Sequence, residues 1–391
     1  MSPTGSAGAT REEDRAAADE TGPTAFGRFF LPGPTEVRPE VLEAMRRPII
    51  GHRGPEMQEL LGGIDPALRS LFRTERPVYI STSSASGLME AAITNLTRRR
   101  VLCLVCGAFG ERFFEIARAC GRPADALRVE WGDPNLPDAL HETLSREPAR
   151  YDLVTVVHSE TSTGVLNPVR EIAGVVRRYD DLLLAVDGVS SVGGAPLEFD
   201  GWGLGFLLTG SQKALALPPG LALAAASERA LQRAEEVPAR GYYFDLLEFE
   251  RRASEHQPTN TPAVSLLFAL RHQLDRIEGE GLEARWDRHR AMAERTHAWV
   301  EEMGRRTGLP YRVLPPVGYR SPTVTTICLP ETVSGRAVVR EVRARGFTIA
   351  AGYGRLKDET IRIGHMGDHT PEELEALLAA LTQVLEGAYA H

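Results

Sequence analysis

The sequence lacks the features that mark membrane proteins and proteins that coat nucleic acids. No apolar run approaches the roughly 18 residues of a membrane-spanning helix, and the most apolar stretch, 214–226, is interrupted at residues 218–220 by Pro-Pro-Gly. Basic residues do not predominate, since 45 Lys and Arg stand against 53 Asp and Glu, a net charge of −8. Such a balance gives no positive field for phosphate backbones or anionic lipid. We therefore predict a cytoplasmic protein that binds neither nucleic acid nor membranes.

Cysteine is scarce as well, with four residues in a chain of 391, which is too few for a disulfide framework. Cys103 and Cys106 form a C-x-x-C pair, a spacing found in redox and zinc sites. Residues 101–106 nevertheless have the pattern of a buried strand, and neither a second C-x-x-C nor a suitable His pair accompanies them. We interpret these thiols as small hydrophobic residues of the core.

The chain divides into a polar N-terminal tail and two regions of different pattern. Apart from Met1, residues 1–26 contain no large apolar residue before Phe26. Such a segment cannot offset the entropy lost on ordering, so we predict a disordered tail. We predict a large α/β domain over residues 27–262 and a smaller α+β domain over residues 263–391.

Short β-rich runs alternate with helix-like stretches from about Pro77 onward, which predicts βαβ units and a mostly parallel sheet. Apolar runs without alternation, such as 182–186, indicate strands covered on both faces. The predicted strands are 78–80, 101–106, 126–131, 153–158, 182–187, 206–209 and 221–226. The predicted helices between them are 88–96, 112–119, 137–145 and 169–179, the last with Asn167 as its N-cap.

The C-terminal region has a different pattern. Helices are predicted over 264–278, 282–306 and 337–345, and strands over 323–329, 347–350 and 360–364. A capping box at 370–373, with Thr370 first and Glu373 last, opens a final helix.

Ligands of open α/β sheets bind beyond the carboxyl ends of the strands, and polar clusters follow the strands here. Residues 82–87 (TSSASG) lead into a helix, where unpaired backbone N–H groups favour phosphate; an ordinary Ser-rich N-cap is the alternative. Residues 158–164 (HSETSTG) form another polar cluster. Asp187 ends an apolar strand. It is either a buried carboxylate, which would need a partner, or an Asp that caps the next turn. Lys213 follows another apolar strand. It is either a buried lysine that is paired or covalently bound, or a solvated lysine of a loop.

Together these clusters indicate one cofactor. A phosphate seat at a helix start, an Asp at one strand end and a Lys after the next strand fit pyridoxal phosphate. Lys213 would form the Schiff base, and Asp187 would pair with the pyridinium nitrogen. A nucleoside triphosphate or a dinucleotide is not indicated, because neither G-x-x-x-x-G-K-[ST] nor G-x-G-x-x-G occurs in the cluster.

The motifs resemble those of the class V aminotransferases, above all the alanine–glyoxylate and serine–pyruvate (serine–glyoxylate) aminotransferases. The resemblance is carried by residues 210–214 (GSQKA), 160–168 (ETSTGVLNP), 186–191 (VDGVSS), 31–35 (LPGPT) and 362–367 (RIGHMG), which keep their order along the chain. It implies fold type I of the pyridoxal phosphate enzymes, an α/β fold with a large, mostly parallel seven-stranded sheet domain and a smaller C-terminal α+β domain.

The resemblance also implies roles for individual residues. Lys213 would carry the cofactor and move a proton, Asp187 would pair with its ring nitrogen, Arg362 would bind the substrate carboxylate, and Gly33 would line the substrate pocket. The residues implied in holding the ring and the phosphate are Ser84, Ala85, Ser86, Phe109, Thr161, Val189 and Gln212. Asn260 and Thr261 resemble a segment that reaches the phosphate of a neighbouring subunit, which implies a homodimer with shared active sites.

The predicted reaction moves the amino group of alanine or serine to a 2-oxo acid such as glyoxylate or pyruvate. The sequence leaves alternatives open: another amine donor, such as an aminophosphonate or a larger amino acid, or a lyase or desulfurase reaction. A desulfurase needs a nucleophilic Cys on a mobile loop, whereas the four cysteines here lie in strand-like or helical stretches. A binding protein without catalysis is a further alternative, which Lys213 and Asp187 together argue against.

Overall fold

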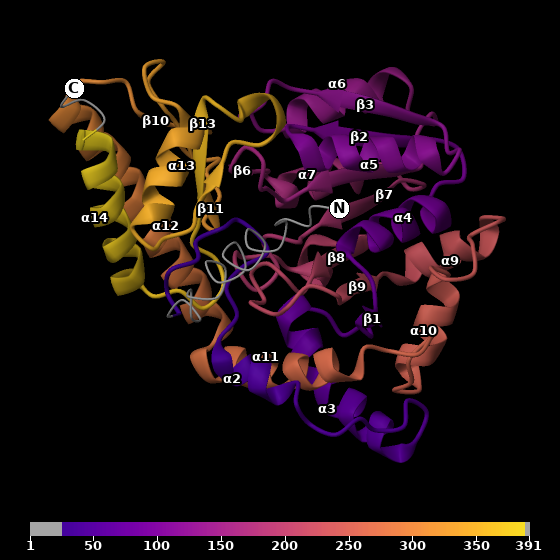
Figure 1. Ribbon diagram of the computed structural model, residues 1–391. Coiled ribbons are helices and arrows are strands. Elements are labelled where there is room, and N and C mark those ends of the chain that lie inside the picture. Colours follow the sequence, from indigo (N-terminus) through magenta and orange to yellow (C-terminus); the bar gives the residue numbers. More distant parts are fainter. Residues whose placement is uncertain (1–25, 388–391) are drawn as a thin grey trace, which may run out of the picture.

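The computed structural model describes residues 26–387, so all but the last residue of the predicted tail lies outside it. A seven-stranded sheet in the order β1-β9-β8-β7-β4-β2-β3 forms the centre of the fold (Figure 1). Strand β9 is antiparallel to both its neighbours, and the other pairs are parallel. The predicted α/β architecture with a mostly parallel seven-stranded sheet is therefore confirmed. No helix within residues 26–387 has the length and apolarity needed to cross a membrane.

The strands of this sheet are β1 (Tyr79–Ser81), β2 (Val101–Val105), β3 (Ala124–Arg128), β4 (Leu153–Val157), β7 (Leu183–Asp187), β8 (Phe206–Gly210) and β9 (Ala222–Ala226). The helices up to this point are α2 (Pro39–Ala44), α3 (Pro55–Phe72), α4 (Ala85–Leu96), α5 (Ala108–Ala119), α6 (Pro137–Arg146), α7 (Val169–Val176) and α8 (Phe199–Trp202).

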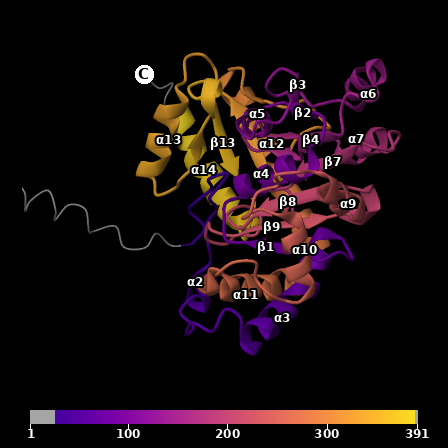
Figure 2. The ribbon, with the colours of Figure 1, turned by 90° about the vertical axis from the view of Figure 1, so that its right-hand side faces the viewer.

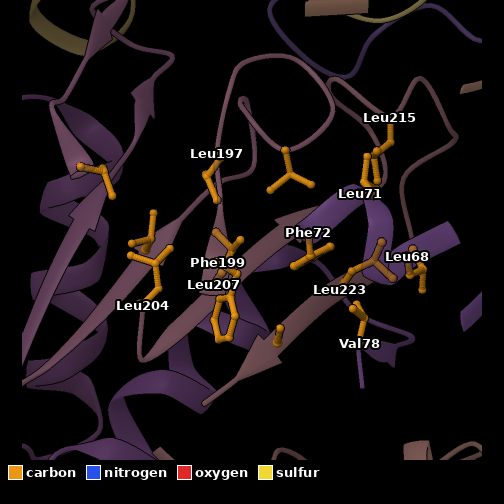
Figure 3. Close-up of a cluster of buried hydrophobic side chains, with 14 of the residues drawn as sticks. Leu68, Leu71, Phe72, Val78, Leu197, Phe199, Leu204, Leu207, Leu215 and Leu223 are labelled. Atoms are coloured by element: carbon orange, nitrogen blue, oxygen red, sulfur yellow. The ribbon is translucent and has the colours of Figure 1, made fainter. Parts of the chain in front are cut away.

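Both faces of the sheet are apolar and covered, because side chains alternate between the faces along each strand. Leu184, Val186 and Leu207 lie on one face with residues of α3, α6, α7 and α11 (Val264–Glu280). Part of this cluster, around Phe72 and Leu223, is drawn in Figure 3. The other face packs against α4, α5, α9 (Glu228–Glu236) and α10 (Leu246–Ser254). This double burial explains why the strands read as continuous apolar runs.

A second, antiparallel sheet stands beside the first in the order β10-β11-β13-β12 (Figure 2). Its strands are β10 (Arg312–Val313), β11 (Val324–Cys328), β12 (Ala350–Ala351) and β13 (Thr360–Gly364), and its helices are α12 (Leu282–Thr307), α13 (Gly335–Ala344) and α14 (Pro371–Gly387). A short 3-10 helix, η1 (Gly354–Leu356), lies between β12 and β13. The hairpin of β5 (Ser159–Glu160) and β6 (Val165–Leu166) reaches this region from the large sheet, since Leu166 N–H donates to Tyr319 O at 2.8 Å.

The start of the described chain packs with this second sheet. Phe30 N–H donates to Thr348 O at 2.7 Å, and Gly364 N–H donates to Phe30 O at 2.9 Å. The Phe30 side chain is fully buried in the same cluster as β11, β13 and α14. Helix α11, in contrast, packs with the cluster of the large sheet. The division at residue 263 stays a prediction, and this packing favours a boundary closer to Gly281.

Several local predictions were wrong. Helix α3 was not predicted, because Gly62, Gly63 and Pro66 interrupt its pattern, yet its apolar face is buried. Asn167 is not an N-cap: its amide donates to Val157 O and Cys106 Sγ, and its Oδ1 accepts from Asn135 N–H. The predicted strand 347–350 forms only as β12, at Ala350–Ala351.

The capping box is confirmed, since Thr370 and Glu373 exchange hydrogen bonds at 2.9 and 3.3 Å.

Candidate active site

A cleft of about 500 Å³ lies at the carboxyl ends of β4, β7 and β8. It is lined by Ser84, Ala85, Ser86, Met89, Phe109, Arg112, Val157, Ser159, Thr161, Asp187, Val189, Ser190, Gln212 and Lys213. Nine residues predicted from the sequence, from five separate segments, are therefore brought together in one place.

The loop after β8 fixes the position of Lys213. Ser211 closes this loop, because its hydroxyl donates to Pro218 O at 2.7 Å and accepts from Leu221 N–H at 3.2 Å. Thr35 braces the loop from outside, with its N–H donating to Gln212 O at 2.8 Å and its hydroxyl to Lys213 O at 2.9 Å. The main chain around the lysine is thus held by the nearby Ser211 and by Thr35, which is distant in sequence.

The Lys213 side chain is buried, with a relative exposure of 7%. Its Nζ donates to Pro32 O at 2.5 Å and to Thr161 Oγ1 at 3.2 Å, and it lies 5.4 Å from the centroid of the Phe109 ring. Burial, with the positive charge of Arg362, lowers the pKa of Lys213 to about 7, although the nearby Asp187 carboxylate opposes the shift. The amine is therefore available in its neutral, nucleophilic form near pH 7.

Asp187 is a buried carboxylate at the last position of β7. Its Oδ1 accepts a hydrogen bond from Val189 N–H at 2.8 Å, and within residues 26–387 it forms no ion pair. Burial raises the pKa of Asp187 to about 6, and the bond from Val189 opposes that shift. A carboxylate in this state is stabilised by a cation that enters the cleft.

The N-terminus of α4 forms another part of the cleft. Ser84 is the N-cap, and its side chain makes no capping hydrogen bond. The N–H groups of Ala85 and Ser86 have no acceptor within the described part of the chain, so both donors are free to bind an anion. Gln212 stands beside them, because a Cβ built on Gly210 would meet both Gln212 Oε1 and the Ala85 methyl.

Glu160 was not assigned a role from the sequence, and it organises the next part of the cleft. Its carboxylate is fully buried and accepts from Phe109 N–H and Gly110 N–H, both at 3.1 Å, at the start of α5. It also accepts from Ser162 N–H at 3.1 Å and from the Ser162 hydroxyl at 2.5 Å. Burial raises the pKa of Glu160, although these bonds favour the charged form. Glu160 thereby joins Phe109 to the hairpin that carries Thr161.

Thr161 connects the cleft to the second sheet. Its hydroxyl shares a hydrogen bond of 2.7 Å with Ser190, and its carbonyl accepts from Arg362 Nη1 at 3.1 Å. Arg362 Nε donates to Ala351 O at 3.1 Å, and within residues 26–387 the guanidinium has no carboxylate partner. Tyr353 lies between Arg362 and Phe109, 5.4 Å from the guanidinium carbon and 5.7 Å from the Phe109 ring, measured at the ring centroids.

The predicted residues do not all meet in this cleft. Asn260 and Thr261 lie on the segment before α11 and do not line it, so their predicted role toward a neighbouring subunit stays a prediction. Arg112 and Tyr353, together with Glu160, were missed. The only sequence signal for Arg112 is its spacing, one helical turn after Phe109.

The comparisons with known proteins agree with this arrangement. Residues 116–377 match the family Aminotransferase class-V. The chain belongs to the class V aminotransferases. It is 40% identical over 367 residues to an uncharacterized aminotransferase of Methanocaldococcus jannaschii, with 92% of each chain covered. It is 32% identical to the alanine–glyoxylate aminotransferase of Oryctolagus cuniculus, with 91% of each covered. The solved alanine–glyoxylate aminotransferase of Nostoc superposes with a TM-score of 0.84 at 31% identity, covering 92% of this chain and 95% of that one.

This aminotransferase is a pyridoxal phosphate-dependent transaminase, and the cleft fits that cofactor. Among residues 26–387 the buried Asp187 carboxylate has no cationic partner, which suits a protonated pyridine nitrogen. The free N–H groups of Ala85 and Ser86 suit a phosphate. Lys213 supplies an amine whose lowered pKa suits a Schiff base. Bound in the cleft, pyridoxal phosphate supplies an electron sink for the carbanion left when the amino donor loses its Cα proton.

Proposed function

We propose that this aminotransferase moves the amino group of a small amino acid, alanine or serine, to glyoxylate or pyruvate. The observation that carries the proposal is the Arg362 guanidinium, which has no acidic partner in the described chain and is joined to Lys213 through Thr161. A planar fork of donors binds a carboxylate with two parallel hydrogen bonds. An α-carboxylate held there would present its Cα to the Lys213 amine.

In this proposal Lys213 has two duties. Its neutral Nζ would bind the cofactor aldehyde. When free, the same nitrogen would take the proton from Cα of the donor and deliver it to C4′ of the cofactor. Asp187 keeps the ring nitrogen protonated by pairing with it. Pro32 O and Thr161 Oγ1 orient the Lys213 amine through the bonds described above.

The remaining residues hold the cofactor. Ala85 and Ser86 would donate backbone N–H groups to the phosphate, with Ser84 as the N-cap and Gln212 beside them. The residues proposed to bind the ring are Phe109 and Val189, which pack on it, and Thr161, whose hydroxyl would reach the phenolic oxygen. Gly33 would line the substrate side, since a Cβ built on it would lie 2.4 Å from Lys213 Cε.

The names of the relatives support glyoxylate as the acceptor. Serine–glyoxylate aminotransferase of Methylorubrum extorquens and L-aspartate–glyoxylate aminotransferase of Paracoccus denitrificans are each 31% identical to this chain. These relatives differ in donor and share the acceptor. A small donor is proposed because Tyr353 and Phe109 narrow the space beside Arg362.

We also propose a homodimer in the cytoplasm. Asn260 and Thr261 would then contact the phosphate held by the other subunit. Tyr242, with 90% of its surface exposed, and the half-exposed Tyr243 follow α9 and provide apolar surface for such a contact. Tyr243 donates to Thr82 O at 3.3 Å, close to the start of α4.

A two-stage half-reaction screen tests the substrates. The purified holoenzyme is mixed with single amino acids and the loss of its visible absorption band is measured, after which single 2-oxo acids are added to restore it. Alanine or serine should bleach the band, and glyoxylate or pyruvate should restore it. Lys213→Ala should lack the initial band, and Arg362→Gln should bleach only at much higher donor concentration.

The alternatives give different outcomes in the same screen. Bleaching by an aminophosphonate or a larger amino acid, and not by alanine or serine, would replace the proposed donor. Release of sulfide from cysteine would indicate a desulfurase. That reaction lacks a suitable nucleophile in the cleft, because none of the four cysteines lines it. Cys103 and Cys106 are also buried, and burial raises the pKa of Cys103 to about 12. A protein without a visible band would be a binding protein.

A further inference from the structure

We propose that Arg112 is a ligand of the cofactor phosphate. Arg112 lines the same cleft as Lys213 and lies on α5, one turn after Phe109. This inference rests on the proposed placement of the cofactor between Asp187 and Lys213, and it adds a charged group to the phosphate end of that site.

Three contacts define the position of the Arg112 side chain. Its guanidinium carbon lies over the Phe109 ring, 4.8 Å from the centroid, and its Nη1 lies 3.5 Å from Ser86 Oγ. Within residues 26–387 it forms no ion pair and no other hydrogen bond. A guanidinium has five donors, so most of its hydrogen-bonding capacity is directed at the cleft or at solvent.

The neighbouring groups are those of an anion site. Ser86 is the second residue of α4, and the free N–H groups of Ala85 and Ser86 form the same end of the cleft. An arginine fork adds two charge-assisted hydrogen bonds to such a seat. The positive charge of Arg112 also contributes to the lowered pKa of Lys213, after burial and Arg362, which agrees with a shared cleft.

Arg362 does not compete for this role. Its contacts are with Thr161 O, Ala351 O and the Tyr353 ring. Arg112 lines the cleft, and Arg362 lies beside it at Thr161. Within residues 26–387 neither arginine has an acidic partner, and their neighbours differ. We assign Arg362 to the substrate carboxylate and Arg112 to the phosphate.

The test compares two forms of the cofactor. Full-length protein freed of cofactor is titrated with pyridoxal phosphate and with pyridoxal, which lacks the phosphate, and both affinities are measured by absorbance for wild type, Arg112→Gln and Arg112→Lys. Arg118→Gln is the control, because Arg118 is exposed on the same helix, its guanidinium carbon lies 5.8 Å from the Phe114 ring centroid, and it does not line the cleft. Thermal unfolding of each protein, with and without inorganic phosphate, accompanies the titrations.

Arg112→Gln should weaken pyridoxal phosphate binding by about 10- to 100-fold, as expected for loss of a hydrogen bond to a charged group. Its affinity for pyridoxal should be unchanged, Arg112→Lys should lie between, and inorganic phosphate should stabilise wild type more than Arg112→Gln. Equal losses for the two cofactor forms would overturn the proposal, since Arg112 would then act through Phe109. Unchanged affinity together with a raised KM for a dicarboxylic donor would also overturn it. The placement of the cofactor at Lys213 is tested separately, because wild type should show a visible band that Lys213→Ala lacks. That test does not depend on the results for the Arg112 variants.

Discussion

A Cβ atom at residue 33 would lie 2.4 Å from Cε and 2.9 Å from Nζ of Lys213. Real Cβ atoms essentially never make contacts this short. Residue 33 must therefore be glycine for the Lys213 side chain to occupy its observed position. The backbone of Gly33 also has φ +123°, which L-residues rarely adopt.

Gly33→Ala should therefore impair cofactor capture more than stability. The added methyl displaces the Lys213 side chain, and the backbone strain costs about 1–3 kcal/mol. The measurements are the visible band of the purified protein and its urea unfolding. Gly121→Ala is the matched control, because Gly121 also has positive φ (+68°) but no atom within 4 Å of the added Cβ. If the two variants bind cofactor equally well, the close approach of residue 33 to the Lys213 side chain does not affect cofactor binding.

The pKa of about 7 at Lys213 predicts the pH dependence of cofactor capture. Only the neutral amine attacks the aldehyde, so the rate should rise with pH up to about 7 and level off above it. An ordinary lysine, with a pKa near 10.4, would still gain rate at pH 9. Stopped-flow absorbance on cofactor-free protein measures the profile.

Two substitutions should move that profile in opposite directions. Arg362→Gln removes a positive charge that lowers the pKa of Lys213, so the midpoint should rise. Asp187→Asn removes a negative charge that raises this pKa, so the midpoint should fall. Shifts of the same sign in both variants would contradict the electrostatic account.

Glu160→Ala should destabilise the protein strongly. Phe109 N–H and Gly110 N–H lose their buried acceptor, and each unpaired group costs about 1–3 kcal/mol. Glu160→Gln keeps an acceptor and should recover part of the loss. Urea unfolding measures the effect, and Glu115→Ala, an exposed change on α5, is the control. Equal stability of Glu160→Ala and the control would show that Glu160 does not anchor α5.

Tyr353→Ala should broaden the range of amino donors. Removing the ring opens the space between Arg362 and Phe109, and even one methylene in a hydrophobic pocket alters specificity by about 10- to 200-fold. The ratio of kcat/KM for a larger amino acid to that for alanine should rise, and Tyr353→Phe should resemble wild type. An unchanged ratio in Tyr353→Ala would mean that the ring does not limit the donor side chain.

The sequence predicted the sheet better than the site. All seven strands of the large sheet were found, and five of them (β2, β4, β7, β8 and β9) are buried along their whole length, which leaves apolar runs. Asp187 ends one of these strands, and Lys213 follows another. Glu160, Arg112 and Tyr353 gave no such signal, because their importance comes from neighbours distant in sequence. Asn167 illustrates the same limit: its local context favoured a helix cap, whereas its partners are Cys106, Val157 and Asn135.

The pairing of Phe30 with Thr348 and Gly364 has a consequence for synthesis of the chain. Chains are made from the N-terminus, and contacts between distant residues form late. Thr35 of the segment that places Pro32 and Gly33 against Lys213 has its partners near Lys213, but Phe30 finds its partners only after β13 has left the ribosome. A nascent chain would thus have Asp187 and Lys213 before the wall that orients the lysine, so competence to capture the cofactor should arise among the last events of folding.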